Sequence, residues 1–209
     1  MSAKYKSPSF LLPNELNTSA NTANDTGVNS LYSMNFNSSD RINFGNFNGF
    51  DITDKFSVSC WVNLSSLGTQ YFISKQLNSG SYRGYIFSLK SDNTLQFALM
   101  ENYNSKQIIV SSSETLSANV WYNLVFTYDG SNSGSGVEMY INGTPTTNTV
   151  SSLGTITTIL NTTDFQISGR GGASGNVNGK IDEVAVFNKA LNTTEIAALY
   201  DGTGSNIRP

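Results

Sequence analysis

The sequence predicts an all-β protein, a sandwich of two antiparallel sheets with one short helix near its C-terminus. About ten to twelve short segments have the composition and alternation of strands, and turn signals separate them at intervals of about 8–12 residues. Hydrophobic residues make up 38% of the 209 residues and aromatic residues 11%, which is enough to fill a core between two sheets. Charged residues make up only 13%, so we expect a polar but largely uncharged surface.

Composition excludes several classes of function. The net charge is −3 and no basic run occurs, which argues against binding of nucleic acid through its phosphates. The chain has no histidine and one cysteine, Cys60, so it forms neither an intrachain disulfide nor the Ser–His and Cys–His pairs of nucleophilic catalysis. Zinc binding by His and Cys is excluded for the same reason. No apolar run approaches the length of a membrane-spanning helix, so no membrane partner is expected.

We expect three parts along the chain: an extended N-terminal arm at residues 1–30, the sandwich at residues 31–202 and a C-terminal tail at residues 203–209. The arm shows no strand period, and alone it cannot bury enough apolar surface to offset the entropy of ordering. Its one apolar patch is Phe10-Leu11-Leu12. Two hypotheses follow. The arm wraps its own sandwich, or it docks on a partner with Phe10, Leu11 and Leu12 as anchors.

The segments that read as strands lie at residues 31–37, 41–44, 56–64, 71–75, 84–90, 94–100, 106–111, 121–129, 136–143, 164–169 and 180–188. In the segment 56–64 every second residue is apolar, which places Cys60 on the buried side as a small hydrophobic residue. Asn142-Gly143 is a strong signal for a tight hairpin turn. The Ser/Gly-rich loop at residues 130–136 is expected to be mobile.

The C-terminal stretch NGKIDEVAVFNKALNTTEIAALY, residues 178–200, reads as a buried strand, a turn and a capped helix. Apolar residues occupy both alternating sets of the strand, as expected where both faces are covered. One set is Ile181, Glu183, Ala185 and Phe187, and the other is Asp182, Val184 and Val186. We expect Asn192 or Thr193 to cap the helix, with Glu195 as the capping-box partner. The apolar face of the helix comprises Ile196, Ala197, Leu199 and Tyr200.

This stretch resembles the signature of laminin G-like jelly-roll domains in the concanavalin A-like lectin/glucanase superfamily, G-x-I-D-E-V-x-I-Y-N-x-A-L-S-x-x-E-I-x-x-L-Y. The matching residues are Gly179, Ile181, Asp182, Glu183, Val184, Val186, Phe187, Asn188, Ala190, Leu191, Glu195, Ile196, Leu199 and Tyr200. FSVSCWV at residues 56–62 is similar to the family's F-T-I-S-A-W-V. WYNLVFTYD at residues 121–129 is similar to its W-H-H-V-A-x-T-Y-D, with both histidines replaced. The resemblance covers about 31–202 and implies a jelly roll.

The resemblance also implies a calcium site. Members of the family often bind one Ca²⁺ through the opening loop and the aspartate of I-D-E. By motif these are Asp40 and Asp182, with backbone carbonyls from Asn37 or Ser38. Asn37 stands where the family has an aspartate, which removes one charged ligand. The alternative is that Asp182 accepts backbone hydrogen bonds and holds no metal.

A glycan site needs exposed aromatic rings for stacking and amide or charged groups for hydrogen bonds. The loops offer four such candidates for carbohydrate binding, Tyr82, Arg83, Tyr103 and Arg170. Tyr82-Arg83 and Tyr103 lie in loops that can share one rim. The alternative is that they are ordinary surface residues, because scattered tyrosines are common on such surfaces.

Hydrolysis of a glycan is not predicted. A retaining glycosidase needs two carboxyl groups about 5–5.5 Å apart. The related glucanases carry the motif E-x-D-x-x-E, and this sequence has no such motif. Asp182 and Glu183 are adjacent, so we expect them to point to opposite faces of their strand. The chain is therefore predicted not to be an enzyme.

The first functional hypothesis is a structural or decoration protein of a larger particle, a phage or virus virion, made in the host cytoplasm. The absence of a signal-peptide segment, the absence of disulfides and the neutral Ser/Asn-rich surface favour it. In this hypothesis the arm binds a shell or capsid protein and the sandwich faces outward. The alternative is a free carbohydrate-binding lectin module, calcium-dependent or not, that acts outside a cell without a Sec-type signal peptide. Surface glycans are candidate partners in both hypotheses, and a homo-oligomer is compatible with both.

Overall fold

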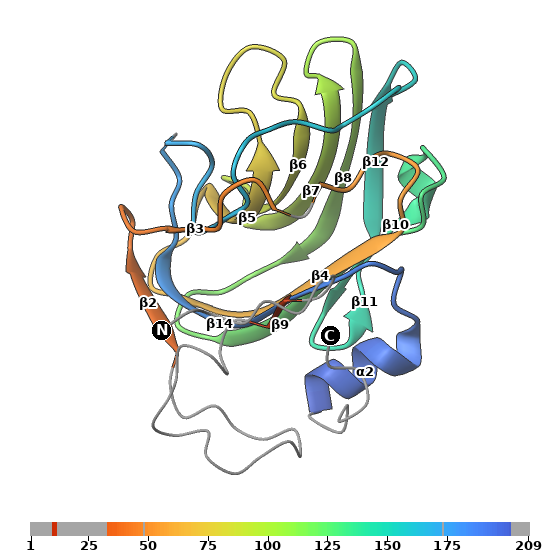
Figure 1. Cartoon of the computed structure of the whole chain (residues 1–209). Coiled ribbons are helices and arrows are strands. Elements are labelled where there is room, and N and C mark those ends of the chain that lie inside the picture. The colour runs from red at the N-terminus through yellow and green to blue at the C-terminus, as the bar shows by residue number, and fades with distance from the viewer. Residues whose placement is uncertain (1–9, 12–32, 48, 173, 202–209) are drawn as a thin grey trace.

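The protein folds as two antiparallel β-sheets stacked face to face, with an α-helix on the outer side of the first sheet (Figure 1). The computed structural model describes residues 10–11, 33–47, 49–172 and 174–201, with the backbone alone for residues 10 and 11. Within these ranges each sheet has seven strands, and no helix is long and apolar enough to cross a membrane. The predicted all-β sandwich with a short C-terminal helix is confirmed.

The first sheet has the strand order β1-β14-β4-β9-β10-β11, and β2 also pairs with β14. Its strands are β1 (Phe10–Leu11), β2 (Met34–Asn37), β4 (Phe56–Leu64), β9 (Trp121–Tyr128), β10 (Val137–Ile141), β11 (Thr144–Pro145) and β14 (Asn178–Phe187). β4 runs along one side of β14, and β2 and β1 pair with successive parts of its other side. The predicted Asn142-Gly143 turn joins β10 to β11.

The second sheet has the strand order β12-β8-β7-β6-β5-β13-β3. Its strands are β3 (Ile42–Asn43), β5 (Gln70–Gln76), β6 (Gly84–Leu89), β7 (Thr94–Asn102), β8 (Lys106–Thr115), β12 (Asn148–Leu153) and β13 (Gln166–Ile167). The sequence did not indicate β12, because its residues are nearly all exposed at the sheet edge and lack an apolar period.

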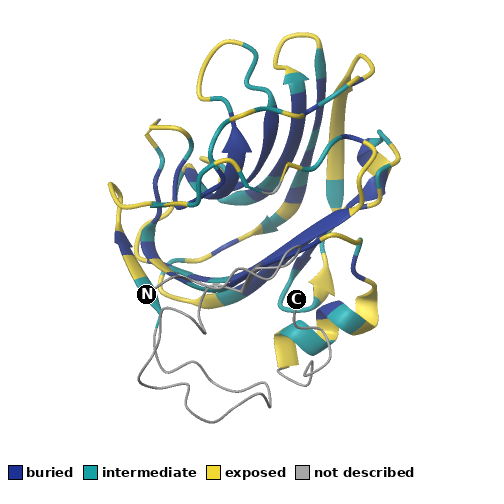
Figure 2. Ribbon diagram, viewed as in Figure 1, coloured by how far each residue is buried: buried dark blue, intermediate teal, exposed yellow. Residues whose placement is uncertain are grey.

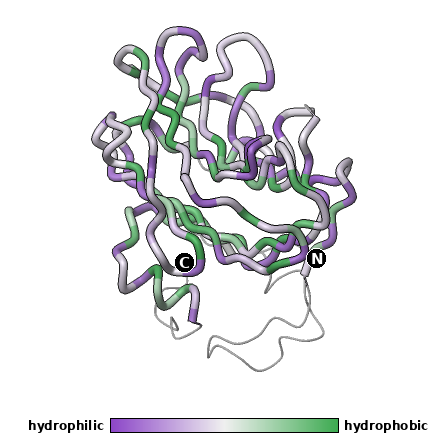
Figure 3. Tube along the Cα trace, turned by 180° about the vertical axis from the view of Figure 1, so that it is seen from behind, coloured by the Kyte–Doolittle hydropathy of each residue, from purple (hydrophilic) through white to green (hydrophobic). Residues whose placement is uncertain are grey.

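The core lies between the sheets, where the apolar sides of the long strands are buried (Figure 2). In β4 the alternate residues Phe56, Val58, Cys60, Val62 and Leu64 are at most 1% exposed, as the sequence pattern predicts. Hydrophobic residues follow the strands, whereas the loops are mostly hydrophilic (Figure 3). Burial raises the pKa of the Cys60 thiol to about 12, so this side chain packs as a neutral apolar group.

β14 contains a β-bulge that the sequence pattern did not reveal. Its register with β4 shifts at Glu183, whose φ of 45° lies in the left-handed region. Ile181 and Val184 therefore both face the core, although they are three residues apart, while Ala185 and Phe187 face the opposite side. The expectation of an unbroken alternation through this strand is wrong. The extra residue at the bulge reverses which residues face the core and which face outward in the second half of the strand.

The helix α2 (Thr193–Asp201) covers the outer face of the first sheet (Figure 1). The predicted capping box forms around Asn192. Its Oδ1 accepts a hydrogen bond from the Glu195 backbone N–H at 3.0 Å, and Glu195 Oε2 accepts one from the Asn192 N–H at 3.1 Å. Ile196 is fully buried in a small apolar cluster with residues of β9, β10 and β14. These contacts cover the second apolar face of β14.

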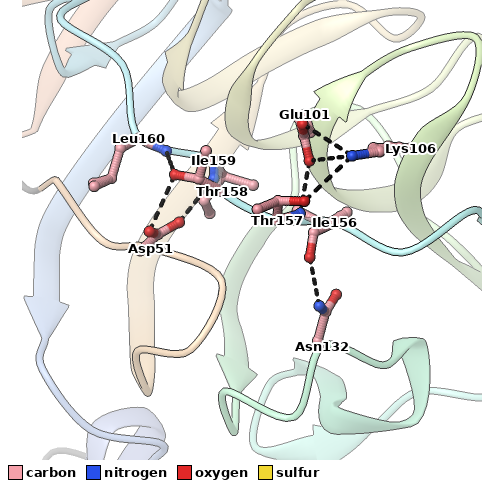
Figure 4. Close-up of polar contacts among 9 residues, drawn as sticks. All are labelled: Asp51, Glu101, Lys106, Asn132, Ile156, Thr157, Thr158, Ile159 and Leu160. Atoms are coloured by element: carbon pink, nitrogen blue, oxygen red, sulfur yellow. Dashed lines mark hydrogen bonds and ion pairs between the residues drawn. The ribbon is translucent and has the colours of Figure 1, made fainter.

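A long connection from β12 to β13, residues 154–165, is fixed to the body of the sandwich by polar contacts (Figure 4). It places Ile156 and Ile159 in the core. Asp51 Oδ1 accepts a hydrogen bond from the Ile159 N–H at 2.8 Å, and its Oδ2 accepts one from the Thr158 hydroxyl at 3.0 Å. One carboxylate therefore satisfies two donors of a segment that has no sheet partner of its own.

Glu101 of β7 holds the same connection at a second point (Figure 4). Its Oε2 accepts a hydrogen bond from the Thr157 N–H at 2.6 Å, and Lys106 Nζ lies 3.2 Å from its Oε1. Asn132 Nδ2 donates to the Ile156 carbonyl at 2.7 Å. The Thr157 hydrogen bond, and to a smaller extent Lys106, lower the pKa of Glu101.

The Glu101→Gln variant is expected to show a weaker dependence of its free energy of unfolding on acidic pH. Because the pKa of Glu101 is lower in the folded chain than its usual value of 4.5, the ionised carboxylate stabilises the fold above that pH. This contribution is lost as the pH falls through the folded value. Urea unfolding at neutral pH and at a series of acidic pH values measures the difference.

The control for this experiment is Glu138→Gln, which removes an exposed carboxylate of β10 in the first sheet. If the two variants lose stability in parallel as the pH falls, then the hydrogen bond from Thr157 is not the origin of the effect.

Candidate functional site

The outer face of the second sheet carries a hollow of about 440 Å³, which we call the outer hollow. Its floor is apolar, because Ile86 of β6, Met100 of β7 and Ile109 of β8 line it and belong to an apolar cluster separate from the main core. These residues alternate along their strands with residues that face the core, so the pleat of the sheet turns them outward.

Two loop tyrosines form one wall of the outer hollow. Tyr82 follows β5 and Tyr103 follows β7, and their rings meet at an interplanar angle of 65° with centroids 5.7 Å apart. The backbone N–H of Tyr103 donates to the Ser81 carbonyl at 3.0 Å, which ties the two loops together. Tyr103 is 50% exposed, more than any other large hydrophobic residue of the described chain. Much of its ring is therefore open to a ligand.

Arg170 lies against the rings of the outer hollow. Its guanidinium carbon is 4.6 Å from the centroid of the Tyr71 ring and 5.2 Å from that of the Tyr82 ring. Its Nη1 donates a hydrogen bond to Gln76 Oε1 at 3.3 Å. Its Nε is buried and has no hydrogen-bond partner among the described residues. Arg170 is thus positioned mainly by aromatic contacts, and among the described residues its one hydrogen-bond acceptor is Gln76.

The backbone beside Arg170 is fixed by hydrogen bonds to the second sheet. The Ser74 hydroxyl of β5 donates to the Gly169 carbonyl at 2.7 Å. The Gly171 N–H donates to Gln166 Oε1 of β13, also at 2.7 Å. These two bonds flank Arg170 on both sides, so the Gly-rich loop presents its side chain at a defined place.

Lys90 is the second charged residue of the outer hollow, and Ser88 and Gln96 add neutral polar groups. Lys90 Nζ forms an ion pair with Asp92 Oδ2 at 2.8 Å. The hydrogen bonds from Lys90 and Thr94 hold the pKa of Asp92 well below its usual range. Asp92 itself does not line the outer hollow, so the charged residues that line it within the described chain are both cations.

Three of the four predicted carbohydrate-binding residues, Tyr82, Tyr103 and Arg170, come together in the outer hollow. Arg83 does not line it. The Arg83 carbonyl accepts a hydrogen bond from Asn161 Nδ2 at 3.1 Å, and its Nε is buried without a partner among the described residues. Arg83 therefore helps to hold the connection between β12 and β13 in place. Glycan binding by Tyr82, Tyr103 and Arg170 stays a prediction.

Sequence reasoning missed Tyr71 and Gln76, which position Arg170. Both belong to β5, where the register with β6 shifts between Tyr71 and Ile73. Phe72 and Ile73 are consecutive, yet both are buried in the core. Simple alternation therefore could not show which face Tyr71 occupies.

Of the two predicted calcium ligands, Asp40 lies in the loop after β2 and Asp182 lies in β14. Asp40 Oδ2 accepts a hydrogen bond from the Asn37 N–H at 3.2 Å, and Asn37 pairs with Asn178 at the start of β14. Asp182 is four residues further along β14, a separation of about 13 Å at a strand rise of about 3.3 Å per residue. Its Oδ1 accepts a hydrogen bond from the Glu183 N–H at 2.9 Å. The hydrogen bonds described here connect each carboxylate to a backbone N–H close to it in the sequence.

No group of three or more acidic or cysteine side chains that could hold a metal ion gathers anywhere in the described ranges. Asp40 and Asp182 therefore do not form a calcium cage with neighbouring acidic residues. Calcium binding stays a prediction, and no step below depends on it.

The described part of the arm pairs with the protein's own first sheet. The backbones of Phe10 and Leu11 form β1, opposite Val186 and Ala185 of β14. Leu12, the rest of the arm and the C-terminal tail lie outside the described residues. The pairing of Phe10 and Leu11 with β14 agrees with the hypothesis that the arm wraps its own sandwich. Docking on a partner through the apolar patch stays a prediction.

The sequence matches the model of a protein family described as the concanavalin A-like lectin/glucanases superfamily over residues 36–197, which is most of the chain. The chain belongs to this superfamily. The resemblance of its C-terminal stretch to the laminin G-like signature is thereby confirmed. No curated protein sequence matches the chain.

Several solved structures share the fold. The binding domain of Paraclostridial Mosquitocidal Protein 1 has a TM-score of 0.61 and 22% identity, over 80% of this chain and 42% of that chain. A mutant Trypanosoma rangeli sialidase that displays trans-sialidase activity has a TM-score of 0.53 and 18% identity, over 73% and 24%. Botulinum neurotoxin type C, whose cell entry depends on interaction with two ganglioside molecules, has a TM-score of 0.52 and 21% identity, over 72% and 36%.

This chain thus spans less than half the length of each of these proteins. At such low identity the likeness shows the shared lectin-like fold. Because one fold can serve many functions, any conclusion about a ligand must be based on the residues of the outer hollow.

The calcium prediction has a direct test in thermal unfolding. If Asp40 and Asp182 hold one ion, CaCl₂ raises the melting temperature of the protein, and Asp182→Asn removes the rise, because a ligand that binds the folded state alone stabilises it. An unchanged melting temperature in CaCl₂ and in EDTA would leave both carboxylates with a hydrogen-bonding role only.

Proposed function

We propose that the protein is a carbohydrate-binding lectin module and that the outer hollow is its glycan site. The observation that carries the proposal is the half-exposed ring of Tyr103, which stands beside Arg170 and polar side chains above an apolar floor. A sugar has an apolar C–H face that packs on aromatic rings and hydroxyl groups that exchange hydrogen bonds with amides, hydroxyls and guanidinium groups.

The wall formed by Tyr82 and Tyr103 supports this proposal, because contacts within the protein already hold the rings in place without a ligand. The edge-on contact with Tyr82 and the backbone hydrogen bond to Ser81 restrain Tyr103. A restrained ring loses little conformational entropy on binding, so more of the stacking energy is available for affinity. Ser88 and Gln96 then offer one hydroxyl and one amide to the hydroxyl groups of the sugar.

We further propose that the site binds glycans without hydrolysing them. A retaining glycosidase needs two carboxyl groups about 5–5.5 Å apart, one as nucleophile and one as acid. The described residues that line the outer hollow include no carboxylate. Stacking, hydrogen bonds and a cation support recognition of a sugar, and they supply no group that attacks its anomeric carbon.

The Tyr103→Ala variant is expected to bind glycans roughly five- to thirtyfold more weakly, as expected for loss of an aromatic contact worth about 1–2 kcal/mol. A glycan array identifies the ligand of the wild-type protein, and isothermal titration calorimetry compares the two proteins. The melting temperature should change little, because half of the Tyr103 side chain is already exposed.

The control for this experiment is Tyr200→Ala. Tyr200 is 42% exposed and stacks on Trp61 on the outer side of the first sheet, away from the outer hollow. We expect this variant to bind glycans like the wild type. Equal affinity of Tyr103→Ala and the wild type would exclude the outer hollow as the site.

Attachment to a virion shell through the arm stays a separate prediction, and it is compatible with glycan binding because an attached decoration protein can still contact glycans. Deletion of residues 1–30 separates the two activities. We expect the truncated protein to keep its glycan affinity, since β1 and β2 pair in the first sheet and the outer hollow lies on the second. Loss of glycan binding on deletion, with an unchanged fold by circular dichroism, would assign the arm to the glycan site.

A further inference from the structure

We infer that the outer hollow recognises an anionic sugar, and that Arg170 binds the negative group. The group is the carboxylate of an acidic sugar or the sulfate ester of a sulfated one, which offer similar charge and oxygen acceptors. This inference rests on the proposed glycan binding and adds the class of ligand.

The first argument is the local charge. The protein as a whole carries a net charge of −3, so its overall field does not attract anions. Within the described residues, however, the charged side chains that line the outer hollow are Arg170 and Lys90. Lys90 already has a partner in Asp92 at 2.8 Å. Arg170 faces two neutral rings and one neutral amide, so its charge is not compensated by a carboxylate there.

The nearby acidic residue of the same sheet does not change this balance. Glu101 follows Met100 in β7, and Met100 belongs to the floor of the outer hollow. Glu101 instead binds Thr157 of the connection between β12 and β13 and Lys106 of β8. These contacts hold the carboxylate at the connection, and Glu101 does not line the outer hollow.

The second argument is the unused hydrogen-bonding capacity of Arg170. A guanidinium has five N–H donors, and Arg170 uses one of them on Gln76. Its Nε is buried without a partner in the described chain, so the donors that a ligand can use belong to the two terminal nitrogens. A planar carboxylate accepts two parallel hydrogen bonds from a guanidinium, which a neutral hydroxyl does not.

The third argument is that the site is prepared for such a pair. The rings of Tyr71 and Tyr82 restrain the guanidinium, and the hydrogen bonds beside it fix the loop. The apolar floor of Ile86 and Met100 lowers the local dielectric constant, which strengthens a charge-assisted hydrogen bond. An acidic sugar fits both parts of the site, because its C–H face can stack on Tyr103 while its anionic group binds Arg170.

The experiment uses the full-length protein on a glycan array that displays the same core saccharides in neutral, carboxylated and sulfated forms. We expect the acidic forms to bind at least about tenfold more tightly than their neutral parents, since hydrogen bonds between charged groups are among the strong ones. The carboxylated and sulfated arms identify the source of the charge. Binding of the preferred form should weaken as NaCl is raised, which stacking alone does not predict.

The Arg170→Gln variant is expected to lose this preference, so that it binds the acidic forms no more tightly than their neutral parents. Arg170→Lys should keep part of it, because lysine retains the charge and loses the planar fork. Arg41→Gln is the matched control, since it removes the same charge from an exposed arginine outside the outer hollow. Melting temperatures confirm that each variant is folded.

The outcomes separate the two proposals. If neutral and acidic forms bind the wild type equally well, the inference about charge is overturned and glycan binding stands. If no saccharide binds in any form, the proposed function fails and the inference fails with it. Equal loss in Arg170→Gln and Arg41→Gln would show that only overall charge matters, and would exclude a specific role for Arg170.

Discussion

The aromatic contacts that join the two sheets are the constraint on which the rest of the structure depends. Phe56 of β4 lies 5.1 Å from Tyr85 of β6, measured between ring centroids, so it connects the first sheet to the second. Phe126 of β9 stacks on Phe97 of β7 with centroids 3.9 Å apart. These rings are fully or almost fully buried, and removing one would leave a cavity in a close-packed core. They fix which side of each strand faces inward, and therefore which residues are left on the outer faces.

The outer face of the first sheet is covered by the helix, whereas the outer face of the second sheet carries the outer hollow. On the first sheet, Ala185 and Phe187 of β14 face outward and are covered by α2. The β-bulge at Glu183 makes this possible, because it directs Val184 and Val186 into the core and their neighbours toward the helix. On the second sheet the corresponding apolar residues form the floor of the outer hollow. A protein with both outer faces covered would have no sheet surface for a ligand.

The chemistry of the outer hollow differs from that of the surface as a whole. The chain is poor in charged residues and slightly acidic, yet the outer hollow brings together two cations and three tyrosine rings. Such a site gains selectivity from a few well-placed groups, with little help from long-range attraction. This suits recognition of a neutral sugar core that carries one anionic substituent. It suits a polyanion such as nucleic acid poorly, because that requires many phosphate contacts.

The edges of the sheets show how the arm fits this design. β14 would expose unpaired backbone groups along the side that faces away from β4. β2 and β1 pair with most of that side, so the edge is protected from pairing with another chain. The two described residues of the arm thus have a role within the protein itself, whatever the remainder of the arm binds.

The sequence by itself determined the all-β class, the positions of most strands and the capped C-terminal helix. It did so because periodicity and capping are local properties: β4 alternates in the sequence as it does in the structure, and Asn192 and Glu195 are three residues apart. It also named Tyr82, Tyr103 and Arg170 as candidates, since they are polar aromatic or charged residues in loops. The edge strand β12 escaped prediction, because its pairing with β8 leaves no apolar pattern.

Only the tertiary structure decided which candidates meet. Tyr82, Tyr103 and Arg170 come from three separate loops, and strand pairing between distant segments brings them to one face of the second sheet. Tyr71 joins the site because an irregularity in β5 interrupts the alternation. Bulges and long-range register depend on contacts between residues far apart in the chain, and a local pattern does not contain them.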